Sequence, residues 1–208
     1  MKVLSIQVGR TRTFAPADPD GKRWRSAIAK EPVSGIVALG LEGLAGDVQA
    51  DRRYHGGPER ALLAYAAEHF AGWCQELSRP SLTPGTFGEN LTLEGLAEAQ
   101  ACIGDVLSLG GAVIQVSQPR MPCVKLARRL AAPGIVARAL ATARTGFYLR
   151  VLRVGEVARG PLALIERPFP RLTVAAALQA LTDPSLRDEL VGCPLLAEGW
   201  RAALAKRR

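Results

Sequence analysis

The sequence predicts a mostly β fold, either a barrel or a sandwich, followed by a small helical unit. Short apolar segments separated by glycine and proline fill the first 168 residues, which is typical of many short strands joined by turns. After Arg167-Pro168-Phe169-Pro170 the pattern changes to short amphipathic segments. A chain of 208 residues can bury one sizeable core and carry a small addition. We therefore expect one domain over residues 1–168 and a second unit over residues 169–208.

The N-terminal residues are expected to form short strands. Residues 3–9 predict a strand that ends at a glycine, and residues 10–25 have the turn residues of a loop or hairpin. Residues 26–33 predict a second strand, and residues 35–39 a third.

A loop with many glycines follows, over residues 40–60. Its glycines let the backbone approach a ligand, and the polar side chains of Asp47, Asp51, Arg53 and His55 lie between them. The pattern is neither the dinucleotide-binding fingerprint nor a phosphate-binding P-loop. The alternative is an ordinary glycine-rich turn with surface ions.

The middle of the chain alternates helix and strand signals. Apolar residues at helical spacing over residues 59–77 predict a packing helix with His69 on its polar flank. Residues 83–95 offer Glu89 and Asn90 for hydrogen bonds, or else form a strand entered through a tight turn. Residues 102–118 predict a hairpin that turns at Gly110-Gly111, and residues 125–143 a helix broken near Pro133-Gly134.

Arg150 occupies an unusual place in the strand expected over residues 145–157. Its apolar neighbours make an arginine costly there unless it is paired. A carboxylate or a bound phosphate is therefore expected beside it, and both remain open.

Cys123 is the most prominent candidate for chemistry. An alternating run leads to two prolines, Pro119 and Pro122, which hold the chain extended and present the cysteine that follows. Arg120 and Lys125 would stabilise its thiolate, the form that ligates soft metals and attacks electrophiles. The alternative is a small apolar residue at the end of a strand.

The C-terminal residues predict three short amphipathic helices. Thr173 is the expected N-cap of residues 174–181, and residues 185–191 and 195–205 follow as two more helices. Helices this short must pack on each other or on the main domain. They suit an interaction surface, including that of a homodimer.

Composition limits the partners and the compartment. The net charge of +8 indicates anionic partners, but the basic residues are dispersed and aromatic residues make up 5% of the chain, which argues against nucleic acid. Four scattered cysteines without CxxC spacing, and no apolar leader, predict a reduced, cytoplasmic protein. No apolar stretch approaches the roughly 20 residues that cross a membrane.

Five motifs in this order closely resemble the MOSC family, the module found at the C-terminus of molybdenum cofactor sulfurases. They are residues 46–51 (GDVQAD), 55–57 (HGG), 87–91 (FGENL), 103–105 (IGD) and 118–125 (QPRMPCVK). Residues 145–151 and the three terminal helices resemble its YiiM-like branch.

The resemblance implies a β-barrel core, a three-helix C-terminal unit and a molybdopterin-type molybdenum cofactor. It implies that Cys123 ligates the metal or carries sulfur, and that His55 and Asp47 supply a proton or orient the cofactor. It also implies reduction of N-hydroxylated compounds with electrons from a separate redox protein. The cofactor-binding residues expected from it are Arg120, Lys125, Arg150, Arg53, Glu89, Asn90 and Thr145.

Other functions remain open at this point. Cys123 could carry a persulfide for delivery to a metal centre, because the same basic thiol pocket serves that purpose. A basic nucleic-acid-binding module would lack a recognisable recognition helix or aromatic platform. A hydrolase using Cys123 and His55 would lack a visible third member.

Overall fold

The computed structural model describes residues 1–16, 21–51 and 56–207. The strands are β1 (Lys2–Gly9), β2 (Arg12–Phe14), β3 (Trp24–Ser26), β4 (Lys30–Pro32), β5 (Val37–Gly40), β6 (Gly43–Leu44), β7 (Leu62–Ala66), β8 (Leu91–Glu94), β9 (Val106–Leu109), β10 (Ala112–Pro119), β11 (Phe147–Arg153), β12 (Gly155–Val157), β13 (Gly160–Pro161) and β14 (Ala163–Glu166). The helices are η1 (Pro58–Arg60), α2 (His69–Glu76), α3 (Val124–Leu130), α4 (Ile135–Ala141), α5 (Val174–Gln179), η2 (Pro184–Leu186), α6 (Arg187–Val191) and α7 (Glu198–Ala205).

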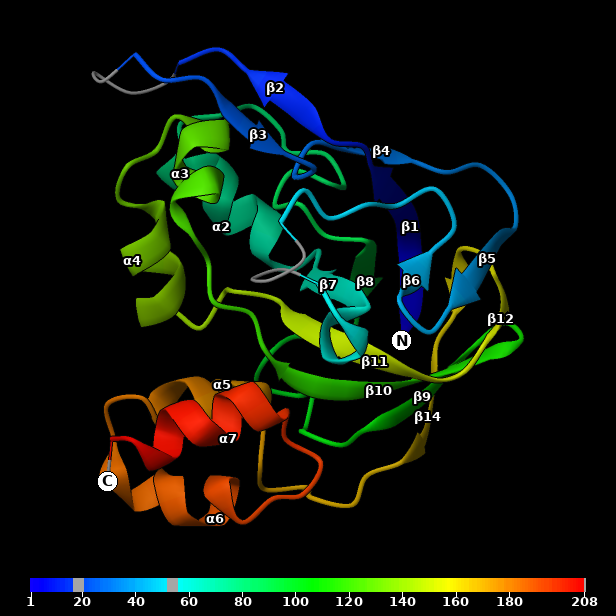
Figure 1. Ribbon diagram of the computed structural model, residues 1–208, viewed down its shortest axis with the longest axis vertical. Helices are drawn as coiled ribbons and strands as arrows, with labels where there is room; N and C mark the ends of the chain where they lie inside the picture. Colours follow the sequence, from blue (N-terminus) through cyan, green and yellow to red (C-terminus); the bar gives the residue numbers. More distant parts are fainter. Residues whose placement is uncertain (17–20, 52–55, 208) are drawn as a thin grey trace.

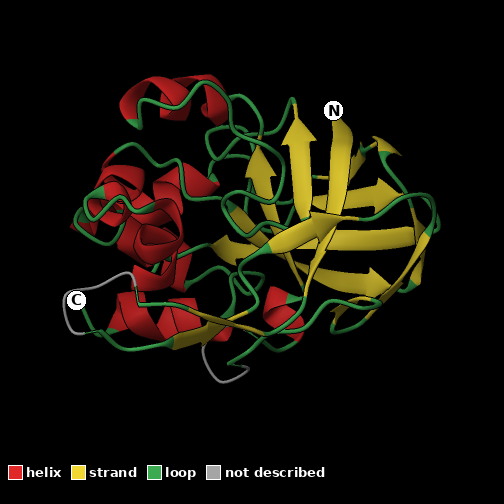
Figure 2. Ribbon diagram, turned by 90° about the horizontal axis from the view of Figure 1, so that it is seen from above, coloured by secondary structure: helices red, strands yellow, loops and turns green. Residues whose placement is uncertain are grey.

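One nine-stranded sheet organises the molecule and curls into a half-barrel (Figures 1 and 2). Its order is β13-β1-β8-β7-β11-β10-β9-β14, and β4 pairs with the far end of β1. The β7–β8 pair is parallel, and the other pairs are antiparallel. The mostly β class predicted from the sequence is confirmed.

Strand β7 replaces part of the helix expected over residues 59–77, and that prediction was wrong. All five residues of β7 are buried, because the strand lies between β8 and β11 in the middle of the sheet. A strand covered on both faces has no apolar alternation, so its sequence cannot be distinguished from a buried helix by periodicity. The helix that does form, α2, begins at His69.

Other local predictions agree with the structure, except for the strand expected over residues 26–33. The hairpin turns at Gly110-Gly111 between β9 and β10, and the helical region after Cys123 divides into α3 and α4 around Pro133-Gly134. The second strand expected over residues 26–33 is instead the end of β3 and the separate strand β4. Strand β3 pairs with β2 as a hairpin, one of the two options for residues 10–25.

Helices α2, α3 and α4 cover one end of the sheet (Figure 1). They enclose a second apolar cluster, in which Tyr65 stacks on Phe87 at 4.3 Å between ring centroids and Trp73 packs nearby. This cluster places the start of α3, and therefore Cys123, at the sheet end where β10 and β11 meet.

The three predicted C-terminal helices are present as α5, α6 and α7, with the short η2 before α6. Thr173 caps α5, because its side chain accepts a hydrogen bond from the Ala176 amide at 3.0 Å. The main apolar core includes residues of both the sheet and these helices. The boundary at residue 168 stays a prediction.

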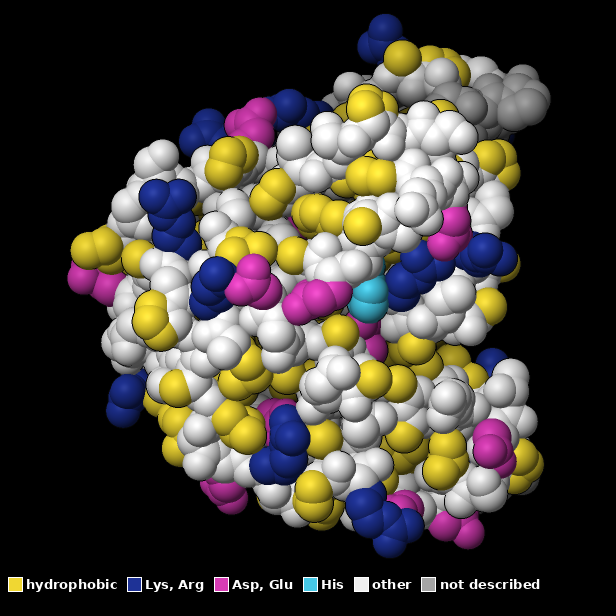
Figure 3. Space-filling model, turned by 180° about the vertical axis from the view of Figure 1, so that it is seen from behind, with side chains coloured by type: hydrophobic (Ala, Val, Ile, Leu, Met, Phe, Trp, Pro, Cys, Tyr) yellow, Lys and Arg dark blue, Asp and Glu magenta, His cyan; other side chains and the backbone are white. Residues whose placement is uncertain are grey.

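On the face in Figure 3, basic side chains are interspersed with acidic and apolar ones, so the positive charge forms no continuous stripe there. Within the described residues, every helix is too short or too polar to cross a lipid bilayer.

Candidate functional site

A cavity opens where Cys123 follows the end of β10. It encloses about 660 Å³ of space, a figure that includes the open solvent at its mouth. Its wall comes from the segments 26–30, 47–51 and 120–125, from Gly88 and Asn90 before β8, and from Arg60 of η1, Leu63 of β7 and Tyr148 of β11. Segments far apart in the sequence therefore meet at one place.

Five of the predicted site residues line this cavity. They are Asp47, Asn90, Arg120, Cys123 and Lys125. The glycine-rich loop and the cysteine segment thus line the same space, as the family resemblance implied.

Asp47 accepts three hydrogen bonds in the wall of the cavity. One carboxylate oxygen accepts from the Gly9 amide and from Lys30 Nζ, each at 2.6 Å, and the other accepts from Asn90 Nδ2 at 2.8 Å. The Asp47 side chain is 2% exposed and that of Lys30 is 8% exposed. A buried carboxylate with three donors acts as an acceptor, so this geometry favours a positioning role for Asp47.

Asn90 extends this contact into the sheet. Its side chain donates to the Gln7 carbonyl at 3.2 Å, and its Oδ1 accepts from the Leu63 amide at 3.1 Å. The position of Asp47 is thereby fixed relative to β1 and β7.

Cys123 is half-buried at the cavity wall, and Arg120 is 5% exposed. The Arg120 amide donates to the Gly146 carbonyl at 3.0 Å, and its guanidinium donates to the Thr145 carbonyl at 3.4 Å. Lys125 follows within the first turn of α3 and lines the same space. The structure therefore combines one thiol with cationic groups, as its sequence neighbours indicated.

Among the titratable residues of the lining, sequence reasoning missed Lys30, Arg60 and Tyr148. Burial lowers the pKa of Lys30, against the opposing effect of Asp47. Burial raises the pKa of Tyr148, while the nearby Arg120 and Arg60 oppose that rise. Tyr148 belongs to the quoted 145–151 segment, but no local signal in the sequence identified Lys30 or Arg60.

Glu89 and Thr145 lie behind the wall and do not line the cavity. Glu89 is fully buried, and its carboxylate accepts from the Gly85 amide at 2.6 Å and the Phe87 amide at 3.0 Å. Burial raises the pKa of Glu89. Thr145 is also fully buried, and its hydroxyl donates to the Gly146 carbonyl at 2.9 Å. In this arrangement, both side chains can affect a ligand only through the loops that they stabilise.

Arg150 has a protein carboxylate as its partner. Its guanidinium donates to Glu59 at 2.6 Å and to the Leu195 carbonyl at 2.7 Å, so it joins β11 to the C-terminal helices. Arg150 is not among the residues that line the cavity. Of the two partners expected from the sequence, the carboxylate is the one observed.

The remaining two predicted residues, Arg53 and His55, lie outside the described residues.

The donor set limits what the cavity can bind. Within residues 1–16, 21–51 and 56–207, no three His, Cys, Asp or Glu side chains are grouped to hold a metal ion. A metal ion at Cys123 would therefore need most of its ligands from a small molecule. Lys30, Arg60, Arg120 and Lys125 outnumber Asp47 and Asp51 in the lining, so the cavity suits an anionic ligand.

Comparisons with known proteins agree with one another. A model of the MOSC domain matches residues 51–161. The protein YflK of Bacillus subtilis is 41% identical over 211 residues, which cover 99% of this chain and 94% of YflK. A protein of Gibberella moniliformis named Reductase is 36% identical over 200 residues, 94% of this chain but 34% of that protein. The crystal structure of YiiM from Geobacillus stearothermophilus has a TM-score of 0.82 and 34% identity, covering 99% of this chain and 97% of that one.

Proposed function

Because the chain belongs to the MOSC domain family, we propose that its cavity binds a molybdopterin-type molybdenum cofactor and that it reduces N-hydroxylated compounds. Electrons would come from a separate redox protein. A homodimer through the C-terminal helices remains part of the proposal, and the compartment we propose is the cytoplasm.

The observation that carries the proposal is the meeting of one thiol with several cations in the wall of one cavity. A soft thiolate is a suitable ligand for molybdenum, and a pterin dithiolene would supply the further soft ligands that the protein lacks. The cofactor and its phosphate are anionic, which fits the excess of cationic side chains in the wall. The residues present therefore fit the group.

The protein's own residues would have distinct roles at the bound cofactor. Cys123 would be the metal ligand, and Arg120 and Lys125 would hold the phosphate. Asn90 and Asp47 would keep the inner wall in place through their contacts with β1 and β7. When bound, the cofactor supplies the two-electron redox chemistry.

Reduction of an N–OH group to N–H and water takes up two electrons and two protons, so the site needs a proton donor. We assign that role to Lys30 Nζ, which lies at the cavity wall and is oriented by Asp47. The lowered pKa of Lys30 makes its ammonium a better acid than a solvated lysine. In this assignment Asp47 orients the proton donor Lys30 and does not itself supply the proton. His55 remains a second candidate.

The similarity to the Gibberella protein named Reductase supports an oxidoreductase role. This chain corresponds to about a third of that protein's length. We therefore propose that the electrons reach this chain from a separate polypeptide.

The proposal is tested by metal and pterin analysis of protein purified from a host that makes the cofactor. We expect molybdenum and pterin in the wild type and loss of molybdenum in Cys123→Ala. Cys74→Ala is the matched control, because Cys74 is also half-buried but lies on α2 outside the cavity lining. Equal molybdenum content in Cys123→Ala and the wild type would exclude the ligand role.

A sulfur carrier is the second candidate, because the cavity presents a single thiol to its ligand. Intact-protein mass spectrometry separates the two functions. A carrier would show one added sulfur atom on Cys123 and no bound molybdenum, whereas the proposed reductase would show molybdenum and turn over a hydroxylamine with a supplied electron donor.

A further inference from the structure

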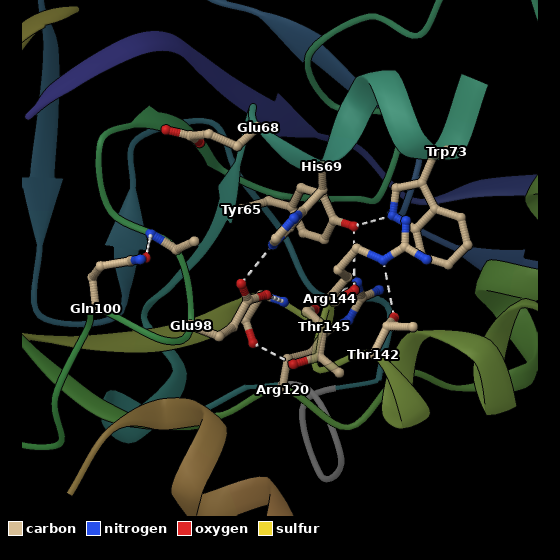
Figure 4. A network of polar contacts seen from close by, with 12 residues as sticks. Tyr65, Glu68, His69, Trp73, Glu98, Gln100, Arg120, Thr142, Arg144 and Thr145 are labelled. Atoms are coloured by element: carbon tan, nitrogen blue, oxygen red, sulfur yellow. Dashed lines mark hydrogen bonds and ion pairs between the residues drawn. The ribbon is translucent and has the colours of Figure 1, made fainter. Parts of the chain in front are cut away.

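A hydrogen-bonded pair of side chains, His69 and Glu98, does not line the cavity and has no part in the function proposed so far. Nε2 of His69, the first residue of α2, lies 2.6 Å from Oε2 of Glu98. The Glu98 side chain is 2% exposed, and that of His69 is 15% exposed. Figure 4 shows the pair at the centre of a polar network. Burial of a carboxylate is unfavourable in free energy unless hydrogen-bond donors satisfy it. The groups that donate to Glu98 therefore indicate which part of the structure it stabilises.

The other oxygen of Glu98 accepts from the Gly146 amide at 2.6 Å. Gly146 is closely confined, because it has a φ of +78° and a Cβ at this position would lie 2.6 Å from the Ala64 carbonyl oxygen. Glu98 therefore fixes the backbone at the entrance to β11 against β7.

This same stretch of backbone holds Arg120. Its amide donates to the Gly146 carbonyl, and its guanidinium donates to the Thr145 carbonyl. A chain of direct contacts thus runs from His69 through Glu98 and Gly146 to Arg120 in the cavity wall.

Neighbouring groups hold the network together. The Tyr65 hydroxyl donates to the Arg144 carbonyl at 3.2 Å and accepts from Trp73 Nε1 at 2.6 Å. The Arg144 guanidinium lies 4.0 Å from the centre of the Trp73 ring (Figure 4). Arg144, the residue before Thr145, is therefore also held in place. With the Gly146 amide on one oxygen of Glu98 and the His69 ring nitrogen on the other, each carboxylate oxygen has a partner.

We infer that His69 and Glu98 are positioning residues for Arg120 and set the positive charge of the cavity. If the His69 donor is removed, Glu98 becomes a buried carboxylate with one partner fewer, and Arg120, which is linked to Glu98 through Gly146, is a cation that can replace the lost donor. Arg120 then turns from the cavity toward Glu98. The inference rests on the proposed function in one respect: the anion that Arg120 would hold is the phosphate of the proposed cofactor.

The test measures alkylation of Cys123 by iodoacetate, which is anionic, and by iodoacetamide, which is neutral. It uses the full chain produced without cofactor, and peptide mass spectrometry follows Cys123 separately from Cys74. The ratio of the two rates reports the positive charge around the thiol. We expect the iodoacetate-to-iodoacetamide ratio to fall about fivefold in His69→Leu. In His69→Gln, whose amide can still donate to Glu98, it should stay close to the wild-type value.

Two comparisons make the test specific. Glu68→Gln is the matched control, because Glu68 lies next to His69 and accepts from the Gly95 amide at 2.6 Å without contacting the Arg120 segment. Its ratio should not change. In an Arg120→Met background the ratio is already low, and His69→Leu should lower it no further.

An unchanged ratio in folded His69→Leu would overturn the inference. A fall in the ratio in His69→Gln or Glu68→Gln as large as that in His69→Leu would also overturn it. So would an effect of His69→Leu on the ratio that is undiminished in the Arg120→Met background. Circular dichroism verifies folding. If His69→Leu does not fold, His69→Asn, whose amide is too short to reach Glu98, takes its place. The readout needs no molybdenum, so a failure of the proposed function is recognised separately.

Discussion

Lys30 and Asp47 show how burial gives single side chains their roles. They are 17 residues apart in the sequence, and they meet in the wall of the cavity with both side chains almost inaccessible to solvent. Two buried charges are tolerated there because each satisfies the other and Asp47 has two further donors. The pair therefore has consequences for both stability and chemistry.

We predict that breaking this pair on one side destabilises the protein more than removing both charges. Lys30→Met leaves a buried carboxylate without its cation and should lower the free energy of unfolding by about 3 kcal/mol. The double variant Lys30→Met/Asp47→Leu should lose less than the sum of the two single variants. Urea denaturation of the four proteins measures the coupling. Additive losses would show that the two charges do not interact.

Glu89 carries a pH dependence of stability. Burial raises its pKa above the ordinary value of 4.5, so the native state binds this proton more tightly than the unfolded state does. The Glu89 contribution to stability is therefore greatest at low pH and is lost as pH rises from about 4.5 through the native pKa.

This sign can be checked with Glu89→Gln, which does not titrate. The variant loses a backbone acceptor at every pH, but its stability relative to the wild type should improve as pH rises above about 4.5. Urea denaturation at several pH values gives the difference. A difference that is constant with pH would contradict the raised pKa of Glu89.

At the scale of elements, caps and turns decide where the short helices begin. Helix α5 has six residues and cannot be stable alone, so its start depends on Thr173 and on packing against the sheet. The Val174 amide donates to the Ala101 carbonyl at 2.8 Å, which ties this first turn to the segment before β9. The sequence signal at Thr173 therefore corresponds to a real contact.

Thr173→Ala should lower the free energy of unfolding by about 1 kcal/mol, because the Ala176 amide loses its acceptor. Thr182→Ala is a suitable control, since Thr182 is exposed and donates only to the Gln179 carbonyl, at 3.2 Å. It should change stability by less than about 0.5 kcal/mol. Thermal and urea unfolding of both variants measure the contrast. Equal losses would show that the cap has no special role.

At the scale of the whole molecule, the sheet and the C-terminal helices share one apolar core. Leu93 and Leu107 of the sheet belong to the same cluster as Leu178, Leu190 and Leu204 of the helices. Backbone hydrogen bonds also cross this boundary, as from the Ala197 amide to the Ser117 carbonyl at 3.0 Å. The helices therefore complete the core in addition to offering a surface to a partner.

A shared core predicts a single cooperative unfolding transition. Far-ultraviolet circular dichroism, which reports all elements, should give the same midpoint as the fluorescence of Trp73 in α2 and of Trp200 in α7. Single-tryptophan variants, with the other tryptophans changed to Phe, assign the two signals. Separate midpoints would show that residues 169–208 unfold as an independent unit.

The sequence by itself determined features that depend on neighbours along the chain. The glycine pair of the β9–β10 hairpin, the break between α3 and α4, and the Thr173 cap each act within a few residues, so a local pattern was enough to find them. The order of the five motifs likewise indicated the family, which the comparisons confirm. Cys123, Arg120 and Lys125 were found together because they are adjacent.

Only the tertiary structure decided which distant groups meet. Strand β7 was not recognised because burial on both faces removed its alternation. Lys30 gave no signal because its role depends on Asp47, and the partner of Arg150 is Glu59, 91 residues away. Such pairings depend on the register and curvature of the sheet, and these follow from the packing of the whole chain rather than from any single segment.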